Sequence, residues 1–116
     1  MNNIALGIYG EKLALKYLKK QKYKILEKNF RCALGEIDIV AKDGEFLVFV
    51  EVKTRSSNAF GEPMEAVDFY KQRKLSKLAV YYQKLKRKLD VPVRFDVVDI
   101  VGEQITLIKS AFESFK

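Results

Sequence analysis

Four charged side chains are grouped around two apolar segments, and their types suit metal-dependent chemistry. Glu36 and Asp38 belong to the first segment, and Glu51 and Lys53 belong to the second. Carboxylates are hard oxygen ligands that favour ions such as Mg²⁺ or Mn²⁺. A lysine beside such an ion can orient a water molecule and stabilise developing negative charge. These residue types therefore indicate a candidate site for metal-dependent hydrolysis.

The composition excludes several other kinds of chemistry. The 116 residues include no histidine, and Cys32 is the only cysteine. A Ser-His-Asp triad, a Cys-His pair, an intramolecular disulfide and a zinc site of clustered Cys and His ligands are therefore excluded. Metal chemistry in this chain has to use carboxylates.

The segments Gly35–Ala41 and Phe46–Thr54 are predicted to form a β-hairpin, because the Asp-Gly pair between them is typical of a tight turn. With that pair as a two-residue turn, Asp38 faces Phe49 and the four charged residues share one sheet face. The opposite face is continuously apolar and is expected to be core: Ile37, Ile39, Ala41, Phe46, Val48, Val50 and Val52.

Like charges on neighbouring strands repel one another, so this acidic face needs an explanation. One interpretation places Glu36, Asp38 and Glu51 in water, paired with basic side chains. The other is a divalent metal site, with Asp38 and Glu51 as ligands and the backbone carbonyl of Val52 as a third oxygen. Lys53 would then stand beside a metal-bound water.

Glu11 is a further acidic candidate, on a helix predicted from Ile4 to about Lys20. It falls on one stripe of that helix with Ala14 and Leu18. A carboxylate buried there is costly without a partner. Glu11 therefore either reaches water or a lysine at the edge of the stripe, or is delivered to the metal site. Gly10 nearby indicates close backbone approach or a frayed first turn.

The remaining elements complete an α-β-β-β-α-β-β order. They are a strand at Tyr23–Arg31, a loop at Arg55–Glu62, a helix from Pro63 to about Leu89, strands at Val93–Val101 and Gln104–Lys109, and a loose turn or helix at Ser110–Lys116. The second helix is expected to bury Leu75, Leu78, Ala79, Tyr82, Leu85 and Leu89. It forms a right-handed crossover that sets the fourth strand parallel to the third. The prediction is an α/β fold with helices packed on a mixed sheet, in a single domain over residues 1–116.

The charge pattern is basic, with 22 Lys and Arg residues against 15 Asp and Glu and a net charge of +7. Most of the basic residues fall in two stretches, Lys16–Lys28 and Lys71–Lys88. These stretches are either solvated helix faces or a surface that binds a polyanion.

The first residues have no secretory-signal pattern, and no apolar run approaches the roughly 18 residues of a membrane span, so we expect a cytoplasmic protein without a membrane partner.

Asp38, followed after 12 residues by Glu51-Val52-Lys53, resembles the D…(D/E)-x-K signature of restriction-endonuclease-like nucleases. The predicted element order also resembles the αβββαβ core of that superfamily. A longer pattern resembles the YraN-like family of small bacterial proteins, which is similar to archaeal Holliday-junction resolvases. That pattern comprises Gly10-Glu11, Ala14, Tyr17, Leu18, Asn29, Gly35–Ala41, Val48–Arg55, Glu65–Val67, Lys71 and Arg94–Val98.

The resemblance implies an endonuclease that hydrolyses DNA phosphodiester bonds with Mg²⁺ or Mn²⁺ and forms a homodimer. It leaves the substrate open, and branched, Holliday-junction-like DNA is the candidate. The resolvases' catalytic residues correspond to Glu11, Asp38, Glu51 and Lys53, with Glu11 as an additional candidate metal ligand. Polar residues opening the second helix contact phosphate in some relatives of the fold. The candidate DNA-binding residues are Arg55, Lys71, Gln72, Lys74 and Lys77. Solvent exposure is the alternative for Lys71 and Gln72, and an ion pair with Glu62 or Glu65 is the alternative for Arg55.

Two other functions are consistent with the sequence. The first is a non-catalytic nucleic-acid-binding module on the same fold, and the second is a protein-interaction subunit. A degenerate nuclease would normally have lost one of Asp38, Glu51 and Lys53, and all three are present. Asp96, on a strand expected to neighbour the metal-binding strand, is predicted to have a structural or ion-pair role.

Overall fold

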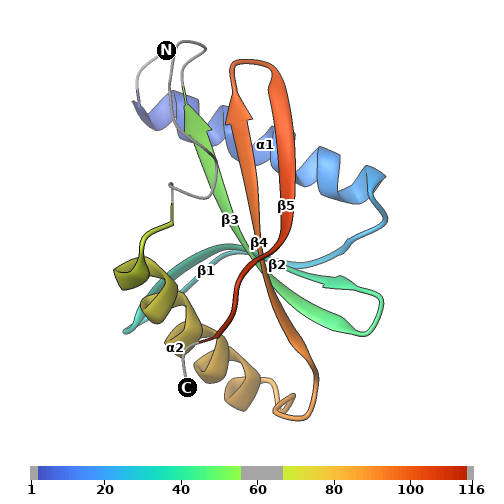
Figure 1. Cartoon of the computed structure of the whole chain (residues 1–116), viewed down its shortest axis with the longest axis vertical. Coiled ribbons are helices and arrows are strands. Elements are labelled where there is room, and N and C mark those ends of the chain that lie inside the picture. Colours follow the sequence, from blue (N-terminus) through green and yellow to red (C-terminus); the bar gives the residue numbers. More distant parts are fainter. Residues whose placement is uncertain (1–2, 56–66, 115–116) are drawn as a thin grey trace.

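The computed structural model describes residues 3–55 and 67–114 (Figure 1). The elements are α1 (Asn3–Lys20), β1 (Lys24–Cys32), β2 (Gly35–Asp43), β3 (Phe46–Arg55), α2 (Phe69–Leu85), β4 (Val93–Val101) and β5 (Gln104–Phe112). The strands form one sheet in the order β1-β2-β3-β4-β5. β3 and β4 are parallel, and the other neighbours are antiparallel. The predicted mixed α/β fold with an αβββαβ core is confirmed.

The ends of α2 differ from the prediction for local reasons. Asp68 caps the helix by accepting a hydrogen bond from the Lys71 N–H at 2.9 Å, so the helix begins at Phe69. The helix ends at Leu85, and Arg87 soon after it has a left-handed φ of 56°. Most of the predicted loop and the predicted helix start at Pro63 lie outside the described residues.

The last strand is longer than predicted, since β5 continues to Phe112 and includes Ser110. The predicted loose turn or helix beginning at Ser110 is therefore wrong. None of the helices in residues 3–55 and 67–114 is long and apolar enough to cross a membrane.

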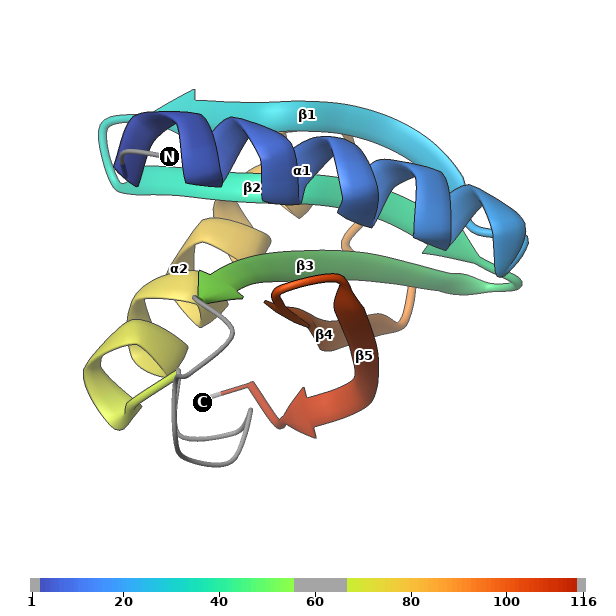
Figure 2. The same cartoon turned by 90° about the horizontal axis from the view of Figure 1, so that it is seen from above.

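The two helices pack on opposite faces of the sheet. On β3, Val48 and Val50 face the core that contains Ala14 and Leu18 of α1, and the alternate residues of β3 face α2. Seen from above in Figure 2, α1 lies in front of β2 and α2 lies behind it. The predicted α2 face is confirmed for Leu75, Leu78, Ala79 and Tyr82, which are buried. It is wrong for Leu85 and Leu89, which are exposed because they lie at and beyond the last turn of the helix.

The β2–β3 turn lies one residue later than predicted. Asp43 faces Phe46, so Gly44 and Glu45 are the turn residues. Of the two turn residues, Gly44 has a positive φ of 61° and Glu45 does not, which is the pattern of a type II′ turn. In that turn the first central residue needs a positive φ, and glycine adopts it without strain. Each pairing partner therefore moves by two positions, and the alternation of faces near the turn is preserved.

β2 separates from β3 at Asp38, and this separation was not predicted. The ladder ends at the Ile39–Val50 pair, and the Asp38 carboxylate accepts a hydrogen bond from the Val52 N–H at 2.8 Å. Ile37 lies in the α2-side core, whereas Ile39 lies in the α1-side core. Ile37 was predicted to share one core face with Ile39 and Ala41. That prediction is wrong for Ile37, because the strand turns about Asp38.

Candidate active site

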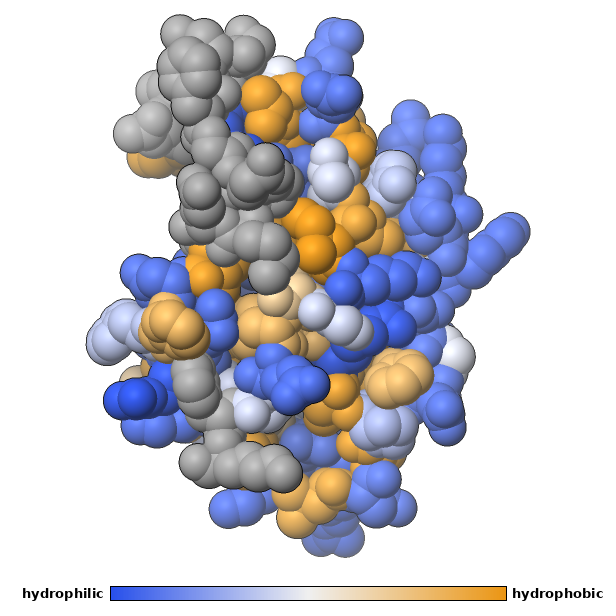
Figure 3. All heavy atoms as spheres, viewed as in Figure 1, coloured by the Kyte–Doolittle hydropathy of each residue, from blue (hydrophilic) through white to orange (hydrophobic). Residues whose placement is uncertain are grey.

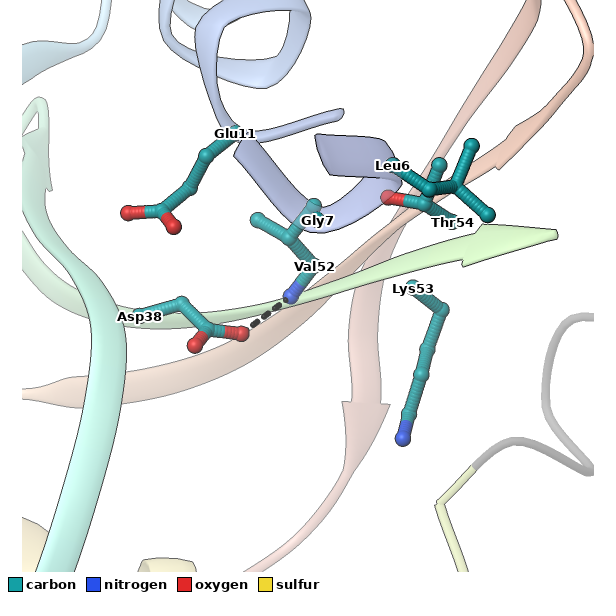
Figure 4. Close-up of a pocket in the computed structure, with 7 residues that line it drawn as sticks. All are labelled: Leu6, Gly7, Glu11, Asp38, Val52, Lys53 and Thr54. Carbon is teal, nitrogen blue, oxygen red and sulfur yellow. Dashed lines mark hydrogen bonds between the residues drawn. The ribbon is translucent and has the colours of Figure 1, made fainter. Parts of the chain in front are cut away.

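Close packing of α1 on β3 brings Glu11 to the site. A Cβ on Gly10 would collide with the Thr54 side chain, so glycine is required for this helix–strand separation. Nothing lies within 4 Å of a Cβ built on Gly7. Close backbone approach is therefore confirmed at Gly10. From the neighbouring position, Glu11 points toward Asp38 (Figure 4).

Two pockets reach Asp38 from opposite sides of the sheet. The α1-side pocket, of about 330 Å³, is lined by Leu6, Gly7, Glu11, Asp38, Val52, Lys53 and Thr54 (Figure 4). The α2-side pocket, of about 220 Å³, is lined by Glu36, Asp38, Glu51, Lys71, Lys74, Leu75 and Leu78. Asp38 is the residue that these two pockets share, because it lies where β2 separates from β3.

Asp38 and Glu51 form an interacting pair of carboxyl groups. Glu51 is only 7% exposed, and Asp38 is partly buried. Burial raises the pKa of Asp38 to about 7, helped by a hydrogen bond with Glu51 and by repulsion from its charge. The Val52 N–H acts in the opposite direction by stabilising the Asp38 carboxylate. The folded protein therefore favours a proton on this pair up to about neutral pH.

Lys71 provides a positive charge at this pair. Its Nζ lies 3.0 Å from Oε2 of Glu51. Burial by itself lowers the pKa of Lys71, but attraction to Glu51 and Asp38 outweighs burial and leaves the pKa raised. Sequence reasoning placed Lys71 at a phosphate or in solvent, and the structure places its ammonium against a buried carboxylate.

Glu11 has a polar partner that sequence reasoning missed. Burial raises the pKa of Glu11, a hydrogen bond with Asn29 opposes this, and repulsion from Asp38 adds to it. Asn29 has a φ of 52°, a left-handed conformation that asparagine tolerates better than most residues. The unusual backbone of β1 at this residue turns an amide toward the Glu11 carboxylate.

Lys53 lines the α1-side pocket, and its backbone lies next to Val52, whose N–H binds Asp38. Figure 4 shows its ammonium group on the opposite side of β3 from Glu11. Glu36 lies in the α2-side pocket, is exposed and pairs with Arg31 at 3.2 Å. Glu36, Asp38 and Glu51 therefore line one pocket, and the Lys53 ammonium lies on the same side of β3 as Glu51, in agreement with the predicted common face.

Two predicted DNA-binding residues have structural partners. Arg55 makes a two-fold ion pair with buried Asp99, at 3.1 Å from Nε and 2.8 Å from Nη2. The alternative partners Glu62 and Glu65 lie outside the described residues. Gln72 donates a hydrogen bond from Nε2 to the Val67 carbonyl at 3.0 Å, which secures the start of α2. Lys74 and Lys77 are exposed.

The oxygen ligands suit Mg²⁺ as a two-carboxylate set. No group of three acidic or cysteine side chains within the described part of the chain could hold a metal ion, so neither Glu36 nor Glu11, a candidate ligand in the sequence, joins Asp38 and Glu51 as a third ligand. Mg²⁺ is commonly held by one or two carboxylates together with waters and substrate phosphates. The interacting pair of Asp38 and Glu51 fits that pattern.

Asp96 has the structural role predicted for it. Its side chain is buried and accepts hydrogen bonds from the Tyr23 hydroxyl at 2.7 Å, Arg94 Nε at 2.9 Å and the Ser110 N–H at 3.1 Å. Arg94 also contacts Asp43 at 2.7 Å, and its hydrogen bond lowers the pKa of Asp43. This network joins β2, β4 and β5 to Tyr23, just before β1, and is separate from the acid pair.

Comparison with known proteins identifies a family. The profile of the uncharacterised protein family UPF0102 matches residues 10–100. A UPF0102 protein of Thermodesulfovibrio yellowstonii is 54% identical over 112 residues, covering 97% of this chain and 99% of the relative. UPF0102 proteins of Geobacter metallireducens and Caldicellulosiruptor saccharolyticus are 52% and 48% identical, and the matches cover 97% of this chain and 96% and 100% of those relatives. The chain therefore belongs to UPF0102, the family described above as YraN-like.

Proposed function

We propose that this protein is a divalent-metal-dependent DNA endonuclease with its active site at Asp38, Glu51, Lys53 and Glu11. The observation that carries the proposal is the interacting pair of carboxyl groups, Asp38 and Glu51. Both line the α2-side pocket, and Asp38 also reaches the pocket that Glu11 and Lys53 line. Interacting acids with a perturbed pKa in a cleft are typical of functional sites. The resemblance to restriction-endonuclease-like resolvases supports the same assignment.

Asp38 and Glu51 would hold Mg²⁺ or Mn²⁺, with the Val52 carbonyl as a further oxygen and Glu11 as an additional acidic group. An ion bound there supplies Lewis-acid chemistry, which acidifies a bound water and neutralises phosphate charge. The Val52 N–H holds the Asp38 carboxylate in place through its 2.8 Å hydrogen bond. The backbone of β3 thus orients one ligand directly.

The other residues of the site would act on the water and on the substrate. Lys53 would orient the attacking water and stabilise negative charge on the phosphate oxygens. Glu11 approaches from the α1 side, and hydrogen bonding by Asn29 favours its ionised form. A carboxylate there can accept a proton from water, as a general base requires.

The exposed lysines supply a surface for the DNA backbone. Figure 3 shows hydrophilic side chains in blue along the outer sides of the molecule, interrupted by apolar residues. On α2, Lys74 and Lys77 are exposed, and Lys74 also lines the α2-side pocket. The lysines of α1 lie beyond the other sheet face, so branched or bent DNA fits the two basic surfaces better than a straight duplex on one face. Cutting two strands of a junction symmetrically would use two active sites, and a homodimer provides them.

A cleavage assay on a panel of junction, flap, single-stranded and duplex DNA tests the proposal. Wild-type protein should cut at least one substrate in Mg²⁺ or Mn²⁺, and Asp38→Asn and Lys53→Ala should abolish cleavage while retaining DNA binding. Glu45→Gln at the exposed hairpin turn and Lys24→Ala at the exposed start of β1 are matched controls and should cut normally.

The same assay distinguishes the alternative function. A protein that binds the panel but cuts nothing with either metal is the non-catalytic nucleic-acid-binding module. Equal cleavage by wild type, Asp38→Asn and Lys53→Ala would also disprove the assigned mechanism.

A further inference from the structure

We propose that Lys71 competes with the divalent ion for Glu51, and that the displaced Lys71 then contacts a phosphate of the DNA. The inference rests on the proposed function for the identity of the metal ligands. It concerns metal affinity, however, which can be measured without DNA and without cleavage.

The competition follows from the position of the ammonium group. Nζ of Lys71 lies 3.0 Å from Oε2 of Glu51, so it occupies one of the two oxygens through which Glu51 would bind the metal. Metal–oxygen distances are about 2.0–2.6 Å, so an ion at this oxygen would lie beside the ammonium. Two cations cannot both occupy that position, because their repulsion is poorly screened beside a side chain that is only 8% exposed.

The structure gives Lys71 a way to leave without unfolding the helix. Its backbone N–H is held by Asp68 at 2.9 Å, whereas its side chain is 38% exposed. The flexible four-carbon stem can therefore move while α2 stays anchored. Glu51 has no comparable freedom, because it is buried in the middle of the sheet.

A released Lys71 would remain on the α2 side of the sheet. Lys74, one turn further along α2, lines the same pocket, so the two ammonium groups would together face an approaching phosphate. Metal binding then converts Lys71 from a partner of Glu51 into a partner of DNA. By thermodynamic linkage, metal and DNA should each increase the affinity for the other.

The test is a titration with Mn²⁺ alone, followed by electron paramagnetic resonance or calorimetry. Lys71→Met removes the charge and keeps the length, and it should bind Mn²⁺ about tenfold more tightly than wild type, or about 1.4 kcal/mol. Lys74→Met is the matched control in the same pocket and should stay within about twofold of wild type, because exposed charge is screened. Lys71→Arg retains a cation and should bind Mn²⁺ no more tightly than wild type.

Mn²⁺ affinity in Lys71→Met that is equal to or weaker than that of Lys74→Met would overturn the competition, provided that circular dichroism shows both variants folded. If Lys71→Met fails to fold, Lys71→Arg still decides: tighter Mn²⁺ binding by that variant would contradict the proposal.

A second measurement tests the phosphate contact. Junction DNA binding is compared in EDTA and in Ca²⁺, and Ca²⁺ should raise the affinity of wild type more than that of Lys71→Met. An equal Ca²⁺ effect in both proteins would overturn this step. Loss of cleavage by Asp38→Asn with no change in Mn²⁺ affinity for Lys71→Met would refute the competition and leave the proposed nuclease standing. Tighter Mn²⁺ binding by Lys71→Met in a protein that cuts nothing would support the competition and refute the proposed nuclease.

Discussion

Asp38→Asn should stabilise the metal-free protein at neutral and alkaline pH. Burial and the interaction with Glu51 raise the pKa of Asp38 to about 7, so the folded protein favours the neutral side chain. Asparagine is also neutral and of nearly the same size. Its carbonyl oxygen can accept the Val52 N–H that the carboxylate accepts, and its amide can donate to Glu51. The variant therefore imitates protonated Asp38 at every pH.

The size and sign of this stability difference follow from the pKa of Asp38 in the unfolded chain, 3.8, and in the folded protein, about 7. Below the ordinary value of 3.8, Asp38 is protonated in both the folded and the unfolded chain and makes no difference to stability. Between 3.8 and about 7 the unfolded chain has released its proton and the folded protein has retained it, so wild type loses stability as the pH rises. The difference of about 3 pH units corresponds to at most about 4 kcal/mol at pH 8, and to about 2–3 kcal/mol between pH 5 and pH 8.

Thermal melting in EDTA at a series of pH values measures this difference. Asp38→Asn should melt at most about 16 °C above wild type at pH 8, using about 4 °C per kcal/mol for a domain of this size. The two melting temperatures should converge toward pH 4. Mg²⁺ should then stabilise wild type but not the variant, because the variant lacks the anionic ligand. A variant that melts below wild type at pH 8 in EDTA, or a difference that does not change with pH, would refute the account of the acid pair.

Three further predictions concern the fold and the basic surface. Gly10→Ala should destabilise the protein by about 1–3 kcal/mol in urea unfolding, because its Cβ would collide with β3, whereas Gly7→Ala, with open space around it, should be neutral or stabilising by up to about 1 kcal/mol. Asp96→Asn should cost about 1.5–3 kcal/mol in the same measurement, because it weakens the charged hydrogen bonds to a largely buried arginine that keeps Asp43 as its other partner, and a cost below about 1 kcal/mol would contradict the structural role. Replacing Lys74 and Lys77 together by glutamine should flatten the salt dependence of DNA binding, and an unchanged slope would place the DNA elsewhere.

The elements around the site could be predicted because their signals are local. Alternating apolar residues define β2 and β3, and glycine at the turn joins them, although the turn residues themselves were predicted one position too early. The residue types at Asp38, Glu51 and Lys53 indicated the class of chemistry, and their spacing placed them on adjacent strands. The apolar stripe of α1 made Glu11 a candidate for the site, with water or a lysine as its alternative partner. Each of these inferences needs only strand alternation, helix periodicity or turn chemistry.

The contacts between distant segments could not be predicted in this way. Arg55 binds Asp99 because β3 and β4 pair in parallel. Asp99 is the pairing partner of Lys53, and Arg55 lies two residues further along β3, within reach of the Asp99 carboxylate. Lys71 reaches Glu51 because α2 crosses the sheet at that point. In the sequence, Arg55 and Lys71 are both candidate phosphate ligands, and no local pattern distinguishes them from Lys74.

The amino-acid sequence by itself determined the fold class, the excluded chemistries and the acidic residues of the candidate site, because these depend on composition and on periodicity within single elements. Only the tertiary structure decided how the acids meet. β2 leaves β3 at Asp38, so its carboxylate binds the Val52 N–H in place of a ladder partner and contacts Glu51 from the side. The tertiary structure also decided which lysine balances their charge. Both outcomes depend on how two helices pack on the opposite faces of one sheet, which no single segment of the sequence determines.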